Sequence, residues 1–111
     1  MLKYIIMLLI ITCLLVSCKA EAYSDTFDVT FYSGGGITAL GTPVYEGIIA
    51  VDPEVIPLGS VVYVEFFGEY SWLSGEYYAA DTGGGIFGNM IDVYITSDPY
   101  ELGRTQAVVY Y

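Results

Sequence analysis

The sequence contains no histidine and only three basic residues, against thirteen aspartates and glutamates. Without histidine, the common zinc sites and the Ser-His-Asp and Cys-His catalytic arrangements are excluded. The formal net charge of −10 argues against nucleic acid as a partner, since phosphate contacts need lysine and arginine, and against attraction to anionic lipid. Acid–base chemistry in this chain therefore falls to carboxylates or tyrosines. We predict no metal and no cofactor.

Cysteine is nearly as scarce, with two residues in the whole chain, Cys13 and Cys18. Both lie in an N-terminal segment that we predict is removed or lipidated, so the mature domain has no disulfide. Residues 23–111 must then hold together by core packing alone, which favours a small closed barrel, acting as a monomer. That segment carries twelve acids against Arg104, a net charge of −11.

Residues 1–22 have the pattern of a signal peptide. A short basic start precedes an apolar run of thirteen residues, Tyr4 to Val16, which at about 1.5 Å per residue is too short to cross a hydrocarbon core of about 30 Å. The chain is therefore predicted to be exported.

The end of that signal peptide has two interpretations. Residues 15–18, Leu-Val-Ser-Cys, resemble a bacterial lipobox, in which Cys18 would be lipidated. Residues 20–22, Ala-Glu-Ala, also fit a cleavage site that would release a secreted protein. We favour the lipobox because the apolar run ends directly against it. The product is then a lipoprotein of the outer membrane, periplasm or cell surface, touching membrane only through its anchor.

Apolar patterns predict an all-β domain of six strands. The expected strands are residues 27–31, 47–51, 60–67, 76–81, 90–96 and 104–111, with a hairpin tip at 68–75. A single helical turn is expected at 98–103, where Asp98 is a capping residue, Pro99 follows it and Gly103 closes the turn.

The stretch from Asp81 to Asp92 is the most informative part of the domain. It holds four glycines between two aspartates that adjoin strand-like runs. In the second run, alternation puts Asp92 on one face with Met90 and Tyr94. Apolar and aromatic neighbours, together with nearby acids, raise the pKa of a carboxyl group, which suits a general acid. The alternative is that Asp92 is an ordinary solvated strand residue and that Asp81 simply begins a turn.

Two short motifs in this stretch lead elsewhere. Gly83-x-Gly85-x-x-Gly88 fits the dinucleotide fingerprint in letters only, because a strand pattern follows where a helix must begin. Asp81-Thr82-Gly83 resembles the active-site triplet of retroviral-type aspartic proteases, a minor alternative that needs a second aspartate from a partner.

A longer series of motifs covers the whole predicted mature chain. It runs through residues 50–53 (Ala-Val-Asp-Pro), 56–59 (Ile-Pro-Leu-Gly), 80–84 (Ala-Asp-Thr-Gly-Gly), 91–94 (Ile-Asp-Val-Tyr) and 101–104 (Glu-Leu-Gly-Arg). This series resembles the 3D domain, named for three aspartates, of membrane-bound lytic transglycosylase A and of stationary-phase survival proteins. The resemblance implies a six-stranded double-psi β-barrel that acts on peptidoglycan glycan strands.

The same resemblance implies roles for individual residues. Asp92 matches the catalytic acid, while Asp81 and Asp52 match the other two aspartates and support the cleft. The motif residues Thr82, Gly83, Gly84 and Asn89 are then expected to bind substrate. One carboxyl group suffices for a lytic transglycosylase, because it protonates the glycosidic oxygen and then deprotonates the sugar's own C6 hydroxyl, closing a 1,6-anhydro ring.

Two family positions that usually carry bases hold Phe87 and Met90 in this chain, so aromatic stacking is an alternative means of holding sugars. Trp72 and Tyr94 are predicted substrate contacts, as are Tyr70 and Tyr77, unless these rings are cross-strand packing partners. An alternative function is a non-catalytic peptidoglycan-binding module.

Overall fold

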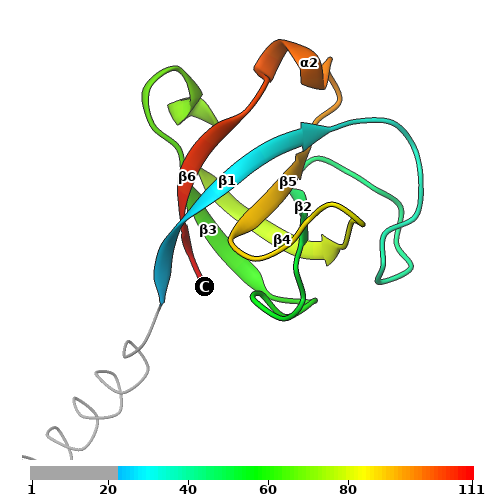
Figure 1. Ribbon diagram of the computed structural model, residues 1–111. Coiled ribbons are helices and arrows are strands. Elements are labelled where there is room, and N and C mark those ends of the chain that lie inside the picture. The colour runs from blue at the N-terminus through cyan, green and yellow to red at the C-terminus, as the bar shows by residue number, and fades with distance from the viewer. Residues whose placement is uncertain (1–22) are drawn as a thin grey trace, which may run out of the picture.

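The computed structural model describes residues 23–111 (Figure 1). The predicted signal peptide, including Cys18, lies outside the described residues. In chain order the elements are β1 (Ser24–Tyr32), β2 (Ile48–Val51), β3 (Val61–Glu65), η1 (Gly68–Leu73), β4 (Gly75–Asp81), β5 (Met90–Tyr94), α2 (Pro99–Leu102) and β6 (Thr105–Tyr110). The prediction of an all-β domain with six strands and one short helical turn is confirmed.

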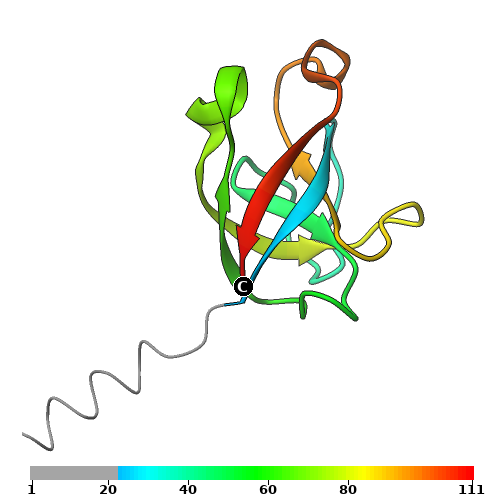
Figure 2. The same cartoon turned by 60° about the vertical axis from the view of Figure 1, so that its left-hand side comes forward.

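The six strands close into a barrel in the order β1-β5-β2-β4-β3-β6. Two pairs, β1 with β5 and β2 with β4, are parallel, and the other four pairs are antiparallel. Closure leaves no free sheet edge. The ends of the domain meet, since Tyr23 and Tyr111 exchange two backbone hydrogen bonds of 2.9 and 2.8 Å, and Figure 2 shows β1 and β6 side by side there.

Strand alternation fills the interior of the barrel. The buried inward-facing residues are Phe27, Val29, Phe31, Ile49, Val51, Val62, Val64, Phe66, Ala79, Ile91, Val93, Ala107 and Val109. Each large apolar side chain so buried contributes about 1.5–3 kcal/mol, which supports a domain that contains no cysteine.

A second, smaller apolar cluster lies on the outside of the barrel. Ile48, Ala80 and Tyr94 are its buried members, and Tyr32, Val44 and Tyr78 pack against it. Val44 belongs to the long segment between β1 and β2, residues 33–47, which covers this part of the barrel. This cover explains why β2 is buried on both faces, although only one face points into the barrel.

The two helical elements lie at one end of the barrel (Figures 1 and 2). α2 has Asp98 as its N-cap, whose side chain accepts the Tyr100 N–H, and ends at Gly103 with φ 67°. The predicted turn is therefore correct in its caps. Residues 68–73, expected within a hairpin tip, form a 3₁₀-helix instead. Within residues 23–111, no helix is long and apolar enough to span a membrane.

Candidate functional site

Four side-chain positions line up across neighbouring strands on the outer face of the barrel. Thr30 of β1 pairs with Asp92 of β5, Asp92 pairs with Ala50 of β2, and Ala50 pairs with Asp81 of β4. Ala50, which is buried, separates the two carboxylates. The row therefore brings together two of the three predicted aspartates.

A β-bulge gives Asp81 its place in this row. Ile49 pairs with Ala79, but the next residue of β2, Ala50, pairs with Asp81, so Ala80 is the extra residue. Because Ala79 points into the barrel, regular alternation would point Asp81 inward as well. The bulge turns its carboxylate to the outside, a known use of such irregularities.

Asp92 is half-buried and is held by a single hydrogen bond. The Thr30 hydroxyl donates to its Oδ1 at 2.9 Å. No group within residues 23–111 donates to its second oxygen, Oδ2, which is left for solvent or a ligand. Burial raises the pKa of Asp92, the Thr30 hydrogen bond opposes that rise, and the nearby Asp81 charge adds to it. Desolvation, more than repulsion by other acids, thus favours the protonated carboxyl group.

Asp81 is held far more completely. Its Oδ1 accepts the backbone N–H groups of Ala39 (3.0 Å) and Thr82 (2.9 Å), and its Oδ2 accepts the Tyr32 hydroxyl at 3.3 Å. Burial, followed by the charge of Asp81, raises the pKa of Tyr32, which therefore keeps its proton for this bond. Asp81 thereby joins the 33–47 segment to the end of β4.

Asp52 lies apart from that row, in the turn that follows β2. Its Oδ1 accepts the Glu54 N–H at 3.0 Å and its Oδ2 accepts the Gly88 N–H at 2.8 Å. These two bonds, the one from Gly88 first, lower the pKa of Asp52. Asp52 thereby ties the 82–89 loop to the turn after β2, close to the start of β5.

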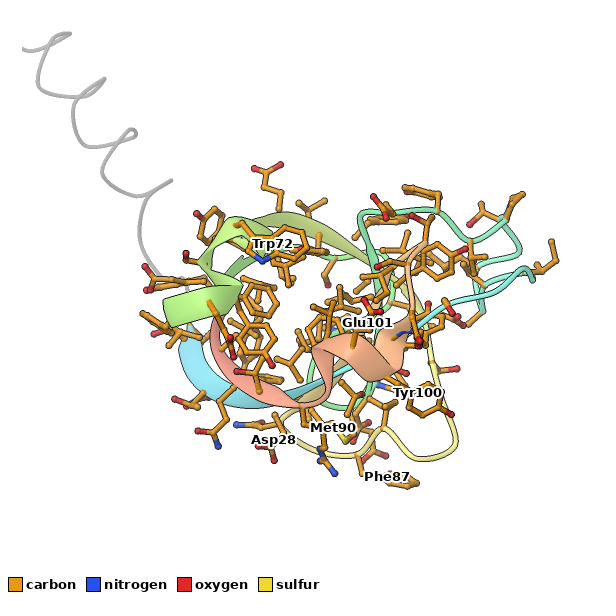
Figure 3. The ribbon with its side chains drawn as sticks, turned by 90° about the horizontal axis from the view of Figure 1, so that it is seen from above. Asp28, Trp72, Phe87, Met90, Tyr100 and Glu101 are labelled. Carbon is orange, nitrogen blue, oxygen red and sulfur yellow. The ribbon has the colours of Figure 1, made fainter. Side chains whose placement is uncertain are left out.

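The loop residues predicted to bind substrate, Thr82, Gly83, Gly84 and Asn89, are all exposed. The loop folds back on itself through Ile86, which is buried and lies so close to Gly83 that a Cβ there would meet its side chain at 3.0 Å. Phe87 projects from the loop with 72% of its surface exposed (Figure 3). The loop therefore presents backbone groups and one aromatic ring to solvent.

The two predicted aromatic contacts differ in exposure. Tyr94 is only 9% exposed, lies edge-on to Tyr32 at 5.3 Å between ring centroids, and donates its hydroxyl to the Gly34 carbonyl at 2.7 Å. Its contacts make it a packing residue that holds the 33–47 segment. Trp72 is 69% exposed on η1, at the helical end of the barrel (Figure 3).

Tyr70 and Tyr77 are also committed to packing. Their hydroxyls donate to the backbone carbonyls of Leu102 (2.5 Å) and Leu73 (2.6 Å), and Tyr70 stacks on Phe31 at 6.2 Å. Both rings therefore have the packing contacts that the alternative interpretation expected, in place of contacts with sugars.

A cavity of about 880 Å³ adjoins the row of site residues. Thr30 and Tyr32, the hydroxyl donors to the two aspartates, line it together with the 96–100 segment and Arg104. In the part of the chain that the structure describes, no three acidic or cysteine side chains are grouped in a way that would hold a metal ion.

Sequence reasoning missed Thr30, Tyr32 and Ala39 as parts of this site. Thr30 and Tyr32 stand at outward positions of an alternating strand, which is a weak signal of exposure. Nothing in the sequence shows that this strand lies beside residue 92, which is 62 positions away.

The family of the chain follows from comparison with known proteins. The model of the 3D domain matches residues 47–111, a region that includes Asp52, Asp81 and Asp92. The chain therefore belongs to the 3D domain family.

Three proteins of Bacillus subtilis are similar in sequence. The cell wall-binding protein YocH is 52% identical over 66 residues, covering 56% of this chain and 21% of its own length. The putative cell wall shaping protein YabE is 57% identical over 93 residues, covering 78% of this chain and 21% of its own length. An SPbeta prophage-derived protein, YorM, is 48% identical over 65 residues, 57% of this chain and 26% of its own length. The chain thus spans about a quarter or less of these relatives.

Two solved structures share the fold. The Streptomyces papain inhibitor aligns with a TM-score of 0.59 at 19% identity, covering 79% of this chain and 92% of its own. The E. coli lytic transglycosylase MltA, an aspartate-to-alanine variant in an apo form, aligns with a TM-score of 0.57 at 23% identity, covering 69% of this chain and 27% of its own. Both are double-psi β-barrels, so the predicted fold is confirmed.

Proposed function

We propose that the protein cleaves glycosidic bonds in bacterial peptidoglycan, in the manner of a lytic transglycosylase, with Asp92 as its acid and base. One observation carries the proposal. A half-buried aspartate with a raised pKa stands on the outer face of the barrel, oriented by Thr30 at one oxygen and open at the other. A raised pKa favours the protonated carboxyl group, which is the form that can protonate a leaving oxygen.

The arrangement of the two carboxylates favours transglycosylation over hydrolysis by an acid–base pair. An inverting glycosidase needs a second carboxylate free to activate water. Both oxygens of Asp81 already accept hydrogen bonds, and in this proposal Asp92 acts alone. In the proposed reaction Asp92 gives its proton to the glycosidic oxygen, and the bond from that oxygen to C1 breaks. The C6 hydroxyl of the same sugar then bonds to C1 and returns a proton to Asp92.

Asp81 and Asp52 act in this proposal through the backbone that they hold. Asp81 holds the 33–47 segment at the end of β4, and Asp52 holds the 82–89 loop. In this proposal the exposed loop residues Thr82, Gly83, Gly84 and Asn89 contact the glycan, and Phe87 offers an exposed ring for stacking. A location outside the cytoplasm is part of the same proposal, with Cys18 lipidation or secretion as its two routes.

A second candidate is a peptidoglycan-binding module without turnover. It is favoured by the name of the relative YocH, a cell wall-binding protein that is 52% identical over 66 residues. The aspartic protease alternative has no such support, and both oxygens of Asp81 in the Asp-Thr-Gly triplet accept hydrogen bonds from within the chain.

Digestion of purified peptidoglycan, followed by mass spectrometry of the products, separates the two candidates. We expect anhydro-muropeptides from the full chain and none above background from Asp92→Asn. Binding to sacculi without product from either protein would leave the binding module as the function. Equal product from both would remove Asp92 from the mechanism.

A further inference from the structure

Arg104 is the one basic residue in the domain, and it lies next to the proposed catalytic row. The last pair of the β1–β6 ladder joins Val29 to Thr105. Continuing that antiparallel register by one residue places Arg104 opposite Thr30. Thr30 in turn pairs with Asp92 on its other side, so Arg104, directly before β6, is followed across the barrel by Thr30 of β1 and Asp92 of β5.

This order sets the spacing between the cation and the acid. Neighbouring strands lie about 4.8 Å apart, so the backbones of Arg104 and Asp92 are separated by roughly 10 Å. A hexose ring measures about half that distance. A sugar whose glycosidic oxygen meets Asp92 would therefore bring its ring substituents within reach of the guanidinium.

The cavity that Arg104 and Thr30 line, next to Asp92 across the strand pair, is suited to a polar ligand. Arg104 lines it, and so do the hydroxyl-bearing side chains of Thr30, Tyr32, Ser33, Ser97 and Tyr100. Tyr100 is 92% exposed and stands at the rim, on α2 (Figure 3). Asp98 also lines the cavity, but its Oδ1 accepts the Tyr100 N–H as the cap of α2.

The negative charge of the domain makes Arg104 the position at which an anionic ligand would bind. Residues 23–111 carry twelve acids and no base besides Arg104, so an anionic ligand is repelled over most of the surface. A guanidinium that donates two parallel hydrogen bonds to a carboxylate is the contact that overcomes such repulsion at short range.

We infer that Arg104 binds a carboxylate on the glycan and that the site selects carboxylate-bearing strands over neutral ones. The inference rests on the proposed function, since it places the ligand of Arg104 beside the bond that Asp92 would cleave. Muramyl sugars bear a lactyl ether whose carboxyl group is free in denuded strands. In peptide-bearing strands that group is amide-linked, and the stem peptide supplies carboxylates of its own.

Binding is measured by calorimetry with the full chain carrying Asp92→Asn, so that no ligand is cleaved. The ligands are denuded peptidoglycan strands, the same strands after reduction of their carboxyl groups to alcohols, and peptide-bearing strands. We expect the untreated denuded or peptide-bearing strands to bind about tenfold more tightly than the reduced ones. Preference for denuded strands assigns the carboxylate to the lactyl group, and preference for peptide-bearing strands assigns it to the stem.

Adding Arg104→Gln to Asp92→Asn should bring the ratio of the affinity for untreated strands to that for reduced strands close to one. Arg104→Lys should retain part of the preference. Glu69→Gln on η1 is the control and should leave the ratio unchanged. The inference would be overturned if the Asp92→Asn chain bound untreated and reduced strands equally, or bound neither. It would also be overturned if Arg104→Gln left the ratio unchanged. Anhydro product from the wild-type chain on the same strands reports separately on the proposed reaction.

Discussion

Asp52 and Asp92 belong to strands or turns that adjoin each other, yet the protein moves their pKa values in opposite directions. Asp52 stands at the surface and accepts two backbone N–H groups, which lower its pKa. Asp92 is half-buried and accepts one hydroxyl, and desolvation raises its pKa. Backbone donors thus lower the pKa of the aspartate that fastens a loop, while burial raises the pKa of the other.

The largest effect should come from Asp92→Asn. An amide keeps the shape and the Thr30 contact but cannot give up a proton, so we predict that the rate of anhydro product formation falls by about 10²- to 10⁴-fold. The measurement is the rate of product release from peptidoglycan. Circular dichroism and sacculus binding should remain as in the wild type. A rate within a few-fold of the wild type would contradict the assignment of Asp92, in contrast to Asp52, as the proton donor.

Asp52→Ala should have a smaller effect by a different route. Loss of both acceptor oxygens frees the Gly88 and Glu54 amides, so we predict roughly tenfold faster hydrogen exchange at both and a similar fall in activity. Because the folded pKa of Asp52 is lowered below its ordinary value of 3.8, the protection is present above that value. It should be lost only as the pH falls through the lower folded pKa.

No change in Gly88 exchange in Asp52→Ala would show that the 82–89 loop keeps its place without this aspartate. Glu69→Gln, on η1 at the other end of the barrel, serves as a control for the loss of one negative charge.

Thr30→Val tests the opposing hydrogen bond at Asp92. Removing the hydroxyl takes away the contact that lowers the pKa of Asp92, so that pKa should rise further. Since activity needs the protonated carboxyl group, the alkaline limb of the pH–rate profile should move to higher pH, with a lower maximal rate because the carboxyl group is less well oriented. Thr30→Ser keeps the donor and should keep the wild-type profile. A profile that moves toward lower pH in Thr30→Val would contradict the assignment.

The smallest effect concerns stability. In the folded state Asp92 binds its proton more tightly than in the unfolded chain, so its contribution to stability falls as the pH rises from 3.8 through the folded pKa. Asp92→Asn should therefore stabilise the domain at neutral pH, by about a few tenths of a kcal/mol because the group is only half-buried and partly screened. The gain should disappear at pH values below 3.8, as measured by urea unfolding across pH.

The sequence predicted the barrel well because alternation reports which side of a strand is buried. The pattern at Val62, Val64 and Phe66, and that at Ile91 and Val93, matched the interior. The caps of α2 were equally predictable from the sequence, because Asp98 and Gly103 contact residues close to them in the chain.

The site was predictable only in part. Asp92 could be placed on an outward face, but its neighbours are set by strand order, and the strand that supplies Thr30 is 62 residues away. The orientation of Asp81 depends on a β-bulge at Ala80. No residue in the sequence there is typical of a bulge, so the bulge could not be predicted. Tyr94 shares the outward face of Asp92 as expected, yet the 33–47 segment covers it, and alternation alone cannot show such a cover.

The most direct test is an NMR titration of the aspartate side-chain carboxyl groups in the full chain. Asp52 and Asp92 are followed in the same spectra, so each serves as the control for the other. We predict that Asp92 titrates above 3.8 and Asp52 below it. If Asp92 titrates at or below the pH at which Asp52 does, burial does not raise its pKa, and its role as the proton donor is contradicted.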